Sequence, residues 1–264
     1  MIPGPFAYHR PTSVREAIGL LVDLGEEARP LAGGHSLIPM MKLRLAAPEH
    51  LVDLAGIPDL KGIRADGSDV VIGAMTTQHE IVGSDLLVAK IPLLREASLL
   101  VADPQVRYVG TLGGNLANAS PAGDTLPVLL AYDAVVVTDR RSIPIDQFFT
   151  GYRKTALQPD ELIVAVRLPL GRRVVFRKVG TRAAQAISKV VTAVSRSPAR
   201  VAIGSVAEVP LRARRAEAAL ERGDMEGAIA AVADDIRPID DVRSTAAYRR
   251  TVTQNVLREL LSVG

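Results

Sequence analysis

Hydrophobic positions near the N-terminus repeat at helical spacing. Over residues 14–24 the apolar side chains recur every three to four positions, which is typical of an amphipathic helix. Ser13 and Glu16 form a capping-box pattern at its start, and Gly25 stands where a C-terminal cap would. The pattern then predicts a strand over 29–32, a helix over 36–45 and a strand over 51–54.

From about residue 59 the pattern changes to hairpins and irregular connections. Two apolar runs, 60–65 and 70–73, flank Asp66-Gly67, a good hairpin-turn signal. A glycine- and asparagine-rich loop is expected at 110–124, and Pro169 and Gly171 mark a boundary. The other elements predicted here are a helix start at 77–80, a helix over 93–101, and strands over 135–138 and 162–168.

The last 90-odd residues predict a sheet followed by helices. In the final helix, Tyr248, Val252, Leu257 and Leu260 or Leu261 share one face. The strands are expected at 174–179, 188–194 and 201–206, and the helices at 211–221, 225–233 and 245–261. The chain is therefore an α+β protein with three expected units, residues 1–58, 59–171 and 172–264.

The 264 residues include no Cys and no Trp. The missing cysteines exclude a disulfide scaffold, a thiolate nucleophile, Cys-ligated zinc and a Cys-ligated iron–sulfur cluster. Any redox centre that this chain uses must therefore be a bound cofactor or belong to another protein.

Charge is nearly balanced, with 32 Lys+Arg against 29 Asp+Glu. Residues 171–264 hold 17 basic against 10 acidic side chains without a dense basic run, which favours a solvated or partner-facing surface over nucleic-acid binding. No apolar stretch reaches the roughly 18 residues of a membrane span. The N-terminus lacks the apolar core of a signal peptide, so we expect a cytoplasmic protein.

Several chemical motifs are absent. There is no Gly-x-Gly of a Rossmann fingerprint, no P-loop, no H-E-x-x-H and no G-x-S-x-G. The histidines are scattered, with no second histidine at ligand spacing, so no metal site is expected; they are His9, His35, His50 and His79.

Two segments, 32–36 and 111–115, combine paired glycines with small polar side chains. Such segments can present backbone N–H groups to an anion such as a pyrophosphate, and Ser36 would open a helix with a dipole of the right sign. Each glycine pair alone could instead form a tight turn with positive φ. Asp124 could accept from a ligand hydroxyl or ring N–H group, or cap a helix at Thr125.

Four motifs in this order resemble the flavin-binding medium subunit of the molybdenum hydroxylases, a group that includes carbon monoxide dehydrogenase and xanthine dehydrogenase. They are AGGHSL at 32–37, TLGGNLANASPAGD at 111–124, DELIVAVRLP at 160–169 and FRKVGTRAAQAISKV at 176–190. The resemblance covers essentially the whole chain. Within the last motif it is greater to xanthine-dehydrogenase-type relatives than to the carbon monoxide enzymes.

The resemblance implies a vanillyl-alcohol-oxidase (PCMH)-type FAD-binding domain of two subdomains, followed by a C-terminal three-stranded sheet with helices. It implies that the first segment holds the FAD pyrophosphate and that the second contacts the phosphates and flavin. The residues implied in FAD binding are Arg29, Leu31, Ala32, Gly33, Gly34, His35, Ser36, Leu37, Ala102, Val106, Gly110, Thr111, Gly114, Asn115, Ala117, Asn118, Gly123, Asp124, Leu162, Ile163 and Lys178.

Some implied roles have ordinary structural alternatives. Leu162 and Ile163 would pack on the cofactor or simply in a strand core, and Lys178 would stabilise an anionic reduced flavin or be a surface cation. Relatives carry a longer connection between Ser195 and Val201, so a clipped hairpin is expected there. The branch of the family with an extra iron–sulfur cluster in this subunit, that of benzoyl-coenzyme-A reductase, is excluded because the chain has no cysteine.

The function implied is electron transfer within a complex. A large molybdenum-cofactor subunit and a small subunit with 2Fe-2S clusters would accompany this chain in a dimer of heterotrimers, and FAD would pass electrons to an external acceptor. No catalytic acid or base and no metal ligand is expected in this chain. The alternatives are a freestanding FAD-dependent oxidase of the same fold and a basic adaptor or nucleic-acid-binding module.

Overall fold

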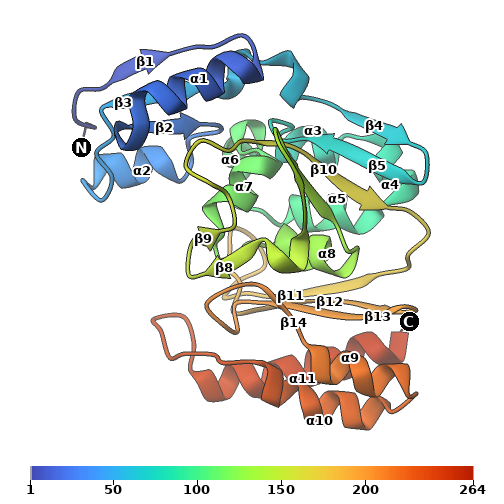
Figure 1. The fold of residues 1–264 in the computed structure, drawn as a ribbon. Helices are drawn as coiled ribbons and strands as arrows, with labels where there is room; N and C mark the ends of the chain where they lie inside the picture. Colours follow the sequence, from blue (N-terminus) through green and yellow to red (C-terminus); the bar gives the residue numbers. More distant parts are fainter. Residues whose placement is uncertain (1, 264) are drawn as a thin grey trace.

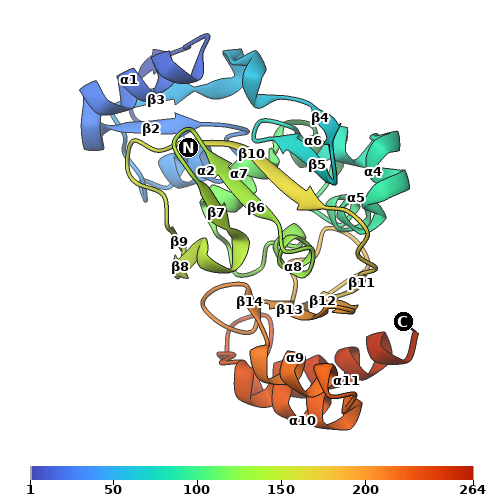
Figure 2. The same cartoon turned by 45° about the vertical axis from the view of Figure 1, so that its right-hand side comes forward.

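The computed structural model describes residues 2–263 and stacks three units along the chain (Figure 1). The N-terminal unit lies on one side of a central sheet-and-helix unit, and the C-terminal sheet packs on the other side (Figure 2). Short 3-10 helices occur at Gly25–Glu27, Leu54–Gly56, Pro58–Leu60 and Ile145–Gln147. No helix within residues 2–263 is both long enough and apolar enough to cross a membrane.

The N-terminal unit is a small parallel sheet in the order β1-β3-β2, with α1 packed against it. Ser13 caps α1 by accepting from the backbone N–H of Glu16, as the capping pattern predicts. Ala17 and Leu21 of α1 are buried in the same cluster as Val52 of β3. The elements are β1 Ala7–His9, α1 Val14–Leu24, β2 Ala28–Leu31, α2 Leu37–Lys42 and β3 His50–Asp53.

The central unit is a five-stranded antiparallel sheet in the order β4-β5-β10-β6-β7. The predicted hairpin at Asp66-Gly67 is confirmed, and Thr77 and Glu80 form a complete capping box. The strands are β4 Ile63–Asp66, β5 Asp69–Gly73, β6 Val135–Thr138, β7 Ser142–Pro144, β8 Phe149–Gly151, β9 Lys154–Thr155 and β10 Ile163–Pro169. The helices are α3 Gln78–Val82, α4 Asp85–Lys90, α5 Pro92–Leu99, α6 Pro104–Val109, α7 Leu112–Asn118 and α8 Thr125–Ala131.

The C-terminal sheet lies between α8 and the last helices, so both its faces are buried (Figure 1). Ala193 and Ala202 pack towards the central core, while Val194 and Ile203 pack towards α9–α11. This double burial explains why the strands read as continuous apolar runs. The elements are β11 Val175–Val179, β12 Val190–Arg196, β13 Ala199–Gly204, β14 Leu211–Arg212, α9 Arg214–Glu221, α10 Met225–Asp235 and α11 Ala246–Val263.

Two expectations for this unit are wrong. The sheet has four strands rather than three, because Leu211–Arg212 pairs with β13 before α9 begins at Arg214. Tyr248 was expected on the buried face of the last helix, but it is 42% exposed in α11. Arg249 is buried instead, and its guanidinium group donates to the carbonyl of Ser205 and to Asp241. The clipped hairpin is confirmed, since Arg196 pairs with Ala199 across a two-residue turn.

Asp133 ties the central unit to the C-terminal sheet. Its carboxylate contacts three guanidinium groups at 2.8 Å, those of Arg172, Arg200 and Arg212. Burial raises the pKa of Asp133, but the hydrogen bond from Arg200 and the three positive charges outweigh that effect and leave it below its ordinary value. The interface therefore carries a compensated charge cluster.

Glu161 should make folding stability depend on acidity. Its side chain is fully buried and accepts from Arg141 at 2.8 Å, Thr138 at 2.7 Å and the backbone N–H of Gln158 at 3.0 Å. The hydrogen bond from Arg141 is the largest effect and lowers the pKa of Glu161 from 4.5 to about 2, against burial. This stabilisation, about 2 kcal/mol, is complete above the unfolded pKa and is lost as pH falls towards 2.

Glu161→Gln should therefore lower the free energy of unfolding by about 2 kcal/mol at neutral pH and flatten its acid dependence. Urea denaturation across pH measures both. Glu226→Gln, at a side chain 79% exposed, should change stability by less than about 0.5 kcal/mol. Equal stability of the Glu161 and Glu226 variants at neutral pH would contradict the assignment.

Candidate cofactor-binding site

The first glycine pair lies in the turn between β2 and α2. Gly34 has φ +71°, a conformation that favours glycine, as the tight-turn alternative predicts. Within residues 2–263, none of the backbone N–H groups of residues 33–36 donates a hydrogen bond. His35 is exposed beside them. This turn therefore offers consecutive free donors of the kind that hold an anion.

The second segment is not the loop that its composition suggests, because Leu112–Asn118 forms α7. Thr111 is the N-cap, and its hydroxyl accepts from the backbone N–H of Gly114 at 3.1 Å. The N–H groups of Leu112 and Gly113 donate to the carbonyls of Thr76 and Ala74. The expectation that both segments present free N–H groups is thus wrong for this one, whose contribution must come from side chains.

The two segments pack directly on each other. A Cβ on Gly33 would lie 2.1 Å from the carbonyl oxygen of Val109 and 2.8 Å from the Cα of Gly110. A Cβ on Gly114 would lie 3.4 Å from the Cβ of Ala32. Small residues are therefore required where the turn after β2 meets the start of α7, and this contact brings together residues almost 80 positions apart.

Asp124 does not cap the following helix. It occupies the N-cap position of α8, but its side chain accepts from Lys178 Nζ at 2.7 Å and forms a very short hydrogen bond with Ser188. Burial raises the pKa of Asp124 above its ordinary value, although Lys178 and Ser188 act to lower it. The surface-cation alternative for Lys178 is wrong, because its side chain is only 7% exposed.

The Lys178 pair is connected to the second glycine segment. Thr125, next to Asp124, donates its hydroxyl to Asn115 Oδ1 at 2.8 Å, and Asn115 follows Gly114 in α7. Lys178 Nζ also donates to the carbonyl of Leu100 at 2.9 Å. A continuous set of contacts therefore runs from the first glycine turn to Lys178.

A cavity of about 340 Å³ opens beside Lys178. One wall is formed by the end of α5, the start of α6 and the residues between them, including Leu99, Ala102 and Arg107, and the other is formed by Gly180 and residues 182–186, which follow β11. Arg182 braces that segment by donating to the carbonyls of Ala184 and Gln185. The volume is in the range of small-molecule sites.

Of the other residues predicted to bind FAD, some lie near the contact between the two glycine segments and others make contacts elsewhere. The elements around the glycine contact contain Leu31, Leu37, Val106 and Ala117, and Ala32 directly follows β2. Arg29 instead donates to the carbonyls of Glu26 and Ala28, and Asn118 accepts from Arg153. A Cβ on Gly123 would clash with Leu126. Leu162 and Ile163 are buried in two different hydrophobic clusters, which fits the alternative of ordinary core residues.

The structure adds residues that the sequence did not single out. Ser188 donates a hydrogen bond to Asp124, next to the bond from Lys178. Its position inside the 176–190 motif is the one feature of the sequence that could have indicated a role for it. Two of the histidines expected to be scattered are neighbours, with His9 Nε2 3.0 Å from His50 Nδ1. His50 also lies within 4.8 Å of Glu27 and Glu49, two exposed carboxylates.

A turn with free N–H donors beside a helix start, and a cavity with a buried lysine, together define a site for a large anionic cofactor. Residues 4–171 match the family described as FAD binding domain in molybdopterin dehydrogenase, and residues 176–262 match the CO dehydrogenase flavoprotein C-terminal domain. The carbon monoxide dehydrogenase medium chain of Afipia carboxidovorans is 46% identical over 98% of this chain and 96% of its own length.

Solved structures indicate the same family as these sequence matches. Reconstituted CO dehydrogenase from Oligotropha carboxidovorans matches with a TM-score of 0.94 and 42% identity, over 99% of this chain and 98% of that chain. The xanthine dehydrogenase FAD-binding subunit of Escherichia coli O157:H7 is 29% identical over 97% of this chain and 94% of its length. The leaning towards the xanthine enzymes that residues 180–190 suggest is therefore not seen over the whole chain.

The chain belongs to the family of FAD-binding medium subunits of the molybdenum hydroxylases. It is an oxidoreductase subunit with FAD as its cofactor. The PCMH-type FAD-binding domain followed by a C-terminal domain, expected from the resemblance, is confirmed.

Proposed function

We propose that this chain accepts electrons from the iron–sulfur clusters of a small partner subunit and passes them, through FAD, to an external acceptor. The observation that carries the proposal is the set of free N–H groups at residues 33–36, which lies against the start of α7 and connects to Lys178. When bound, FAD supplies chemistry that no side chain can, since it takes up electrons singly and releases them in pairs.

The residues fit that cofactor in two parts. The N–H groups of residues 33–36 would hold the pyrophosphate, and the free amide nitrogen of Asn115 and the hydroxyl of Thr111 would donate from α7. Lys178, held between Asp124 and the carbonyl of Leu100, would place a positive charge beside the flavin in the adjoining cavity. Ala102 and residues 180–186 would exclude water from it.

The assembly proposed is a dimer of heterotrimers with a large molybdenum-cofactor subunit and a small 2Fe-2S subunit. Its support is the medium-chain naming of the relatives and the absence of cysteine in this chain, which leaves it without cluster ligands of its own. On this proposal the chain alone does not oxidise the primary substrate. The division into residues 1–58, 59–171 and 172–264 and the cytoplasmic location stay predictions.

Ser36→Asp should weaken FAD binding by about tenfold or more. Aspartate is as good an N-cap as serine, so α2 should form normally, but a carboxylate would stand beside the pyrophosphate and repel it. Ser36→Asn is the matched neutral control, since it keeps a polar cap of the same size. Flavin content and FAD affinity measured by visible absorbance and fluorescence would distinguish the two variants.

The electron-transfer role is tested in the complete complex. In complexes assembled with Ser36→Asp, reduction of the iron–sulfur clusters by substrate should persist while transfer to the acceptor falls with flavin occupancy. FAD binding by Ser36→Asp equal to that by Ser36→Asn would refute the pyrophosphate assignment. A yellow chain that oxidises small alcohols without partners would favour a freestanding oxidase, and a colourless chain with salt-dependent nucleic-acid binding would favour an adaptor.

A further inference from the structure

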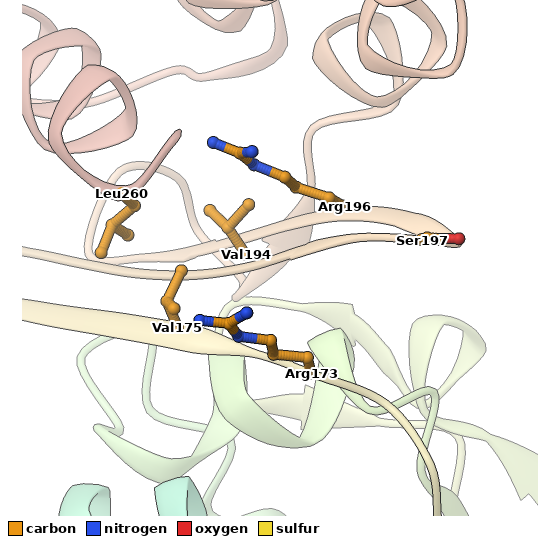
Figure 3. A pocket seen from close by; sticks show the side chains of 6 residues that line it. All are labelled: Arg173, Val175, Val194, Arg196, Ser197 and Leu260. Carbon is orange, nitrogen blue, oxygen red and sulfur yellow. The ribbon is translucent and has the colours of Figure 1, made fainter. Parts of the chain in front are cut away.

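A second cavity, of about 170 Å³, opens in the C-terminal unit where the sheet meets the end of α11 (Figure 3). Its apolar wall is formed by Val175 of β11, Val194 of β12 and Leu260 of α11. Its polar wall is formed by Arg173, Arg196 and Ser197. In Figure 3 the two arginine side chains lie on either side of Val194.

The two arginines form an unbalanced pair of positive charges. Val175 is the first residue of β11 to pair with β12, and its partner is Val194, so Arg173 and Arg196 both lie just beyond this end of the β11–β12 pairing. Two like charges that line one cavity repel each other. Within residues 2–263 neither guanidinium group has a carboxylate within salt-bridge distance or a hydrogen-bond acceptor, unlike Arg177, which reaches Glu259.

Alternation along the strands puts both arginines on the apolar face. Arg173 lies two residues before Val175, the first residue of β11, and Arg196 lies two residues after Val194 in β12, so alternation places all four side chains on one side of the sheet. That side packs on α11 through Val175, Val194 and Leu260. The cavity is therefore a hollow with an apolar floor and two unpaired positive charges at its rim.

We propose that this cavity is a binding site for a small monocarboxylate that carries a compact apolar group. The carboxylate would accept from the guanidinium groups of Arg173 and Arg196, whose planar donor sets match carboxylate oxygens. The apolar group would cover Val194 and Leu260. A compact multivalent anion would leave the apolar floor uncovered, which disfavours phosphate.

This site is separate from the proposed cofactor site. Arg173 precedes β11, whereas Lys178 lies near its opposite end, about 17 Å along an extended strand. Ligand binding here should therefore leave the flavin spectrum unchanged. For that reason failure of this proposal and failure of the proposed function give different results.

The test is calorimetric titration of the FAD-loaded full chain with benzoate, using acetate, benzamide and phosphate as comparison ligands. Benzoate should bind with one-to-one stoichiometry. Acetate, without the apolar group, and benzamide, without the charge, should each bind about tenfold more weakly or not at all. Arg173→Gln and Arg196→Gln should each weaken benzoate binding by about tenfold, while Arg222→Gln, at an exposed arginine of α9's C-terminus, should leave it unchanged.

Thermal unfolding gives a second readout that does not depend on heat signals. Benzoate should raise the unfolding temperature of the wild-type chain but not that of the Arg173→Gln/Arg196→Gln double variant. Without ligand, that double variant should be at least as stable as the wild type, because two like charges that line one cavity have been removed. Undetectable benzoate binding, benzoate binding by both arginine variants as tight as that by the wild type, or tighter binding of acetate or phosphate than of benzoate would each overturn the proposal.

Discussion

Replacing Lys178 by methionine should lower the free energy of unfolding by about 3–5 kcal/mol at neutral pH. Asp124 is 7% exposed and Lys178 Nζ is its only cationic contact, at 2.7 Å, within the described residues. Methionine fills a similar volume, so the loss would come from a buried carboxylate left with Ser188 alone. Urea denaturation followed by far-ultraviolet circular dichroism measures it in a chain that has no tryptophan.

The loss should depend on pH in a defined direction. The pKa of Asp124 is already raised by burial, and removing Lys178 removes the effects that lower it. A raised pKa in the folded state contributes stability that is complete below the unfolded pKa, 3.8, and is lost as pH rises through the folded pKa. Lys178→Met should therefore approach the wild-type stability in mild acid and fall away from it towards alkaline pH.

The double variant Lys178→Met/Asp124→Asn is the matched control, because it removes both charges of the pair. It should recover most of the stability and lose the pH dependence. Equal stability of the single and the double variant at neutral pH would show that Lys178 does not stabilise the fold by compensating the charge of Asp124.

The same variants test the proposed place of Lys178 beside the flavin. Lys178→Met exchanges a neutral ion pair for a net negative charge, so the flavin reduction potential should fall. Lys178→Met/Asp124→Asn is neutral again and should return the potential towards the wild-type value. A potential that is equal in all three proteins would remove Lys178 from the flavin site.

Most helices and strands could be predicted because their periodicity is local. Residues 14–24, the Asp66-Gly67 hairpin and the Thr77 capping box follow rules that act over a few residues, and each is confirmed. The strands β1, β7, β8, β9 and β14 are not predicted, because each has only two or three residues and is defined by its pairing rather than by a periodic pattern. The core face of α11 was misplaced because a buried arginine takes a position that periodicity gives to an apolar residue.

The candidate site was predictable in its motifs but not in its hydrogen bonds. Paired glycines mark both segments, and the family resemblance indicated that they bind one cofactor. Whether these N–H groups are free depends on residues far away in the sequence. The carbonyls of Thr76 and Ala74 accept hydrogen bonds from the first N–H groups of α7, whereas no acceptor within residues 2–263 bonds to the N–H groups of residues 33–36. The bond from Ser188 to Asp124 spans 64 residues and has no local signal.

Replacing Gly33 by alanine should cost at least about 3 kcal/mol and abolish FAD binding. The added Cβ would stand 2.1 Å from the carbonyl oxygen of Val109 and 2.7 Å from its carbonyl carbon, and both are backbone atoms that no side-chain rotation can move. The turn after β2 would have to separate from the segment that enters α7. Both halves of the proposed pyrophosphate site would then lose their relative position, so affinity and stability should fall together.

Gly19→Ala is the matched control because it makes the same substitution in the same unit. Gly19 lies within α1 and a Cβ there would meet no atom within 4 Å, so this variant should keep FAD and gain about 0.5–1 kcal/mol of stability. Denaturation of the apoprotein separates the effect on the fold from the effect on the cofactor. An apo Gly33→Ala chain as stable as Gly19→Ala, and able to bind FAD with wild-type affinity, would show that the two segments do not meet as described.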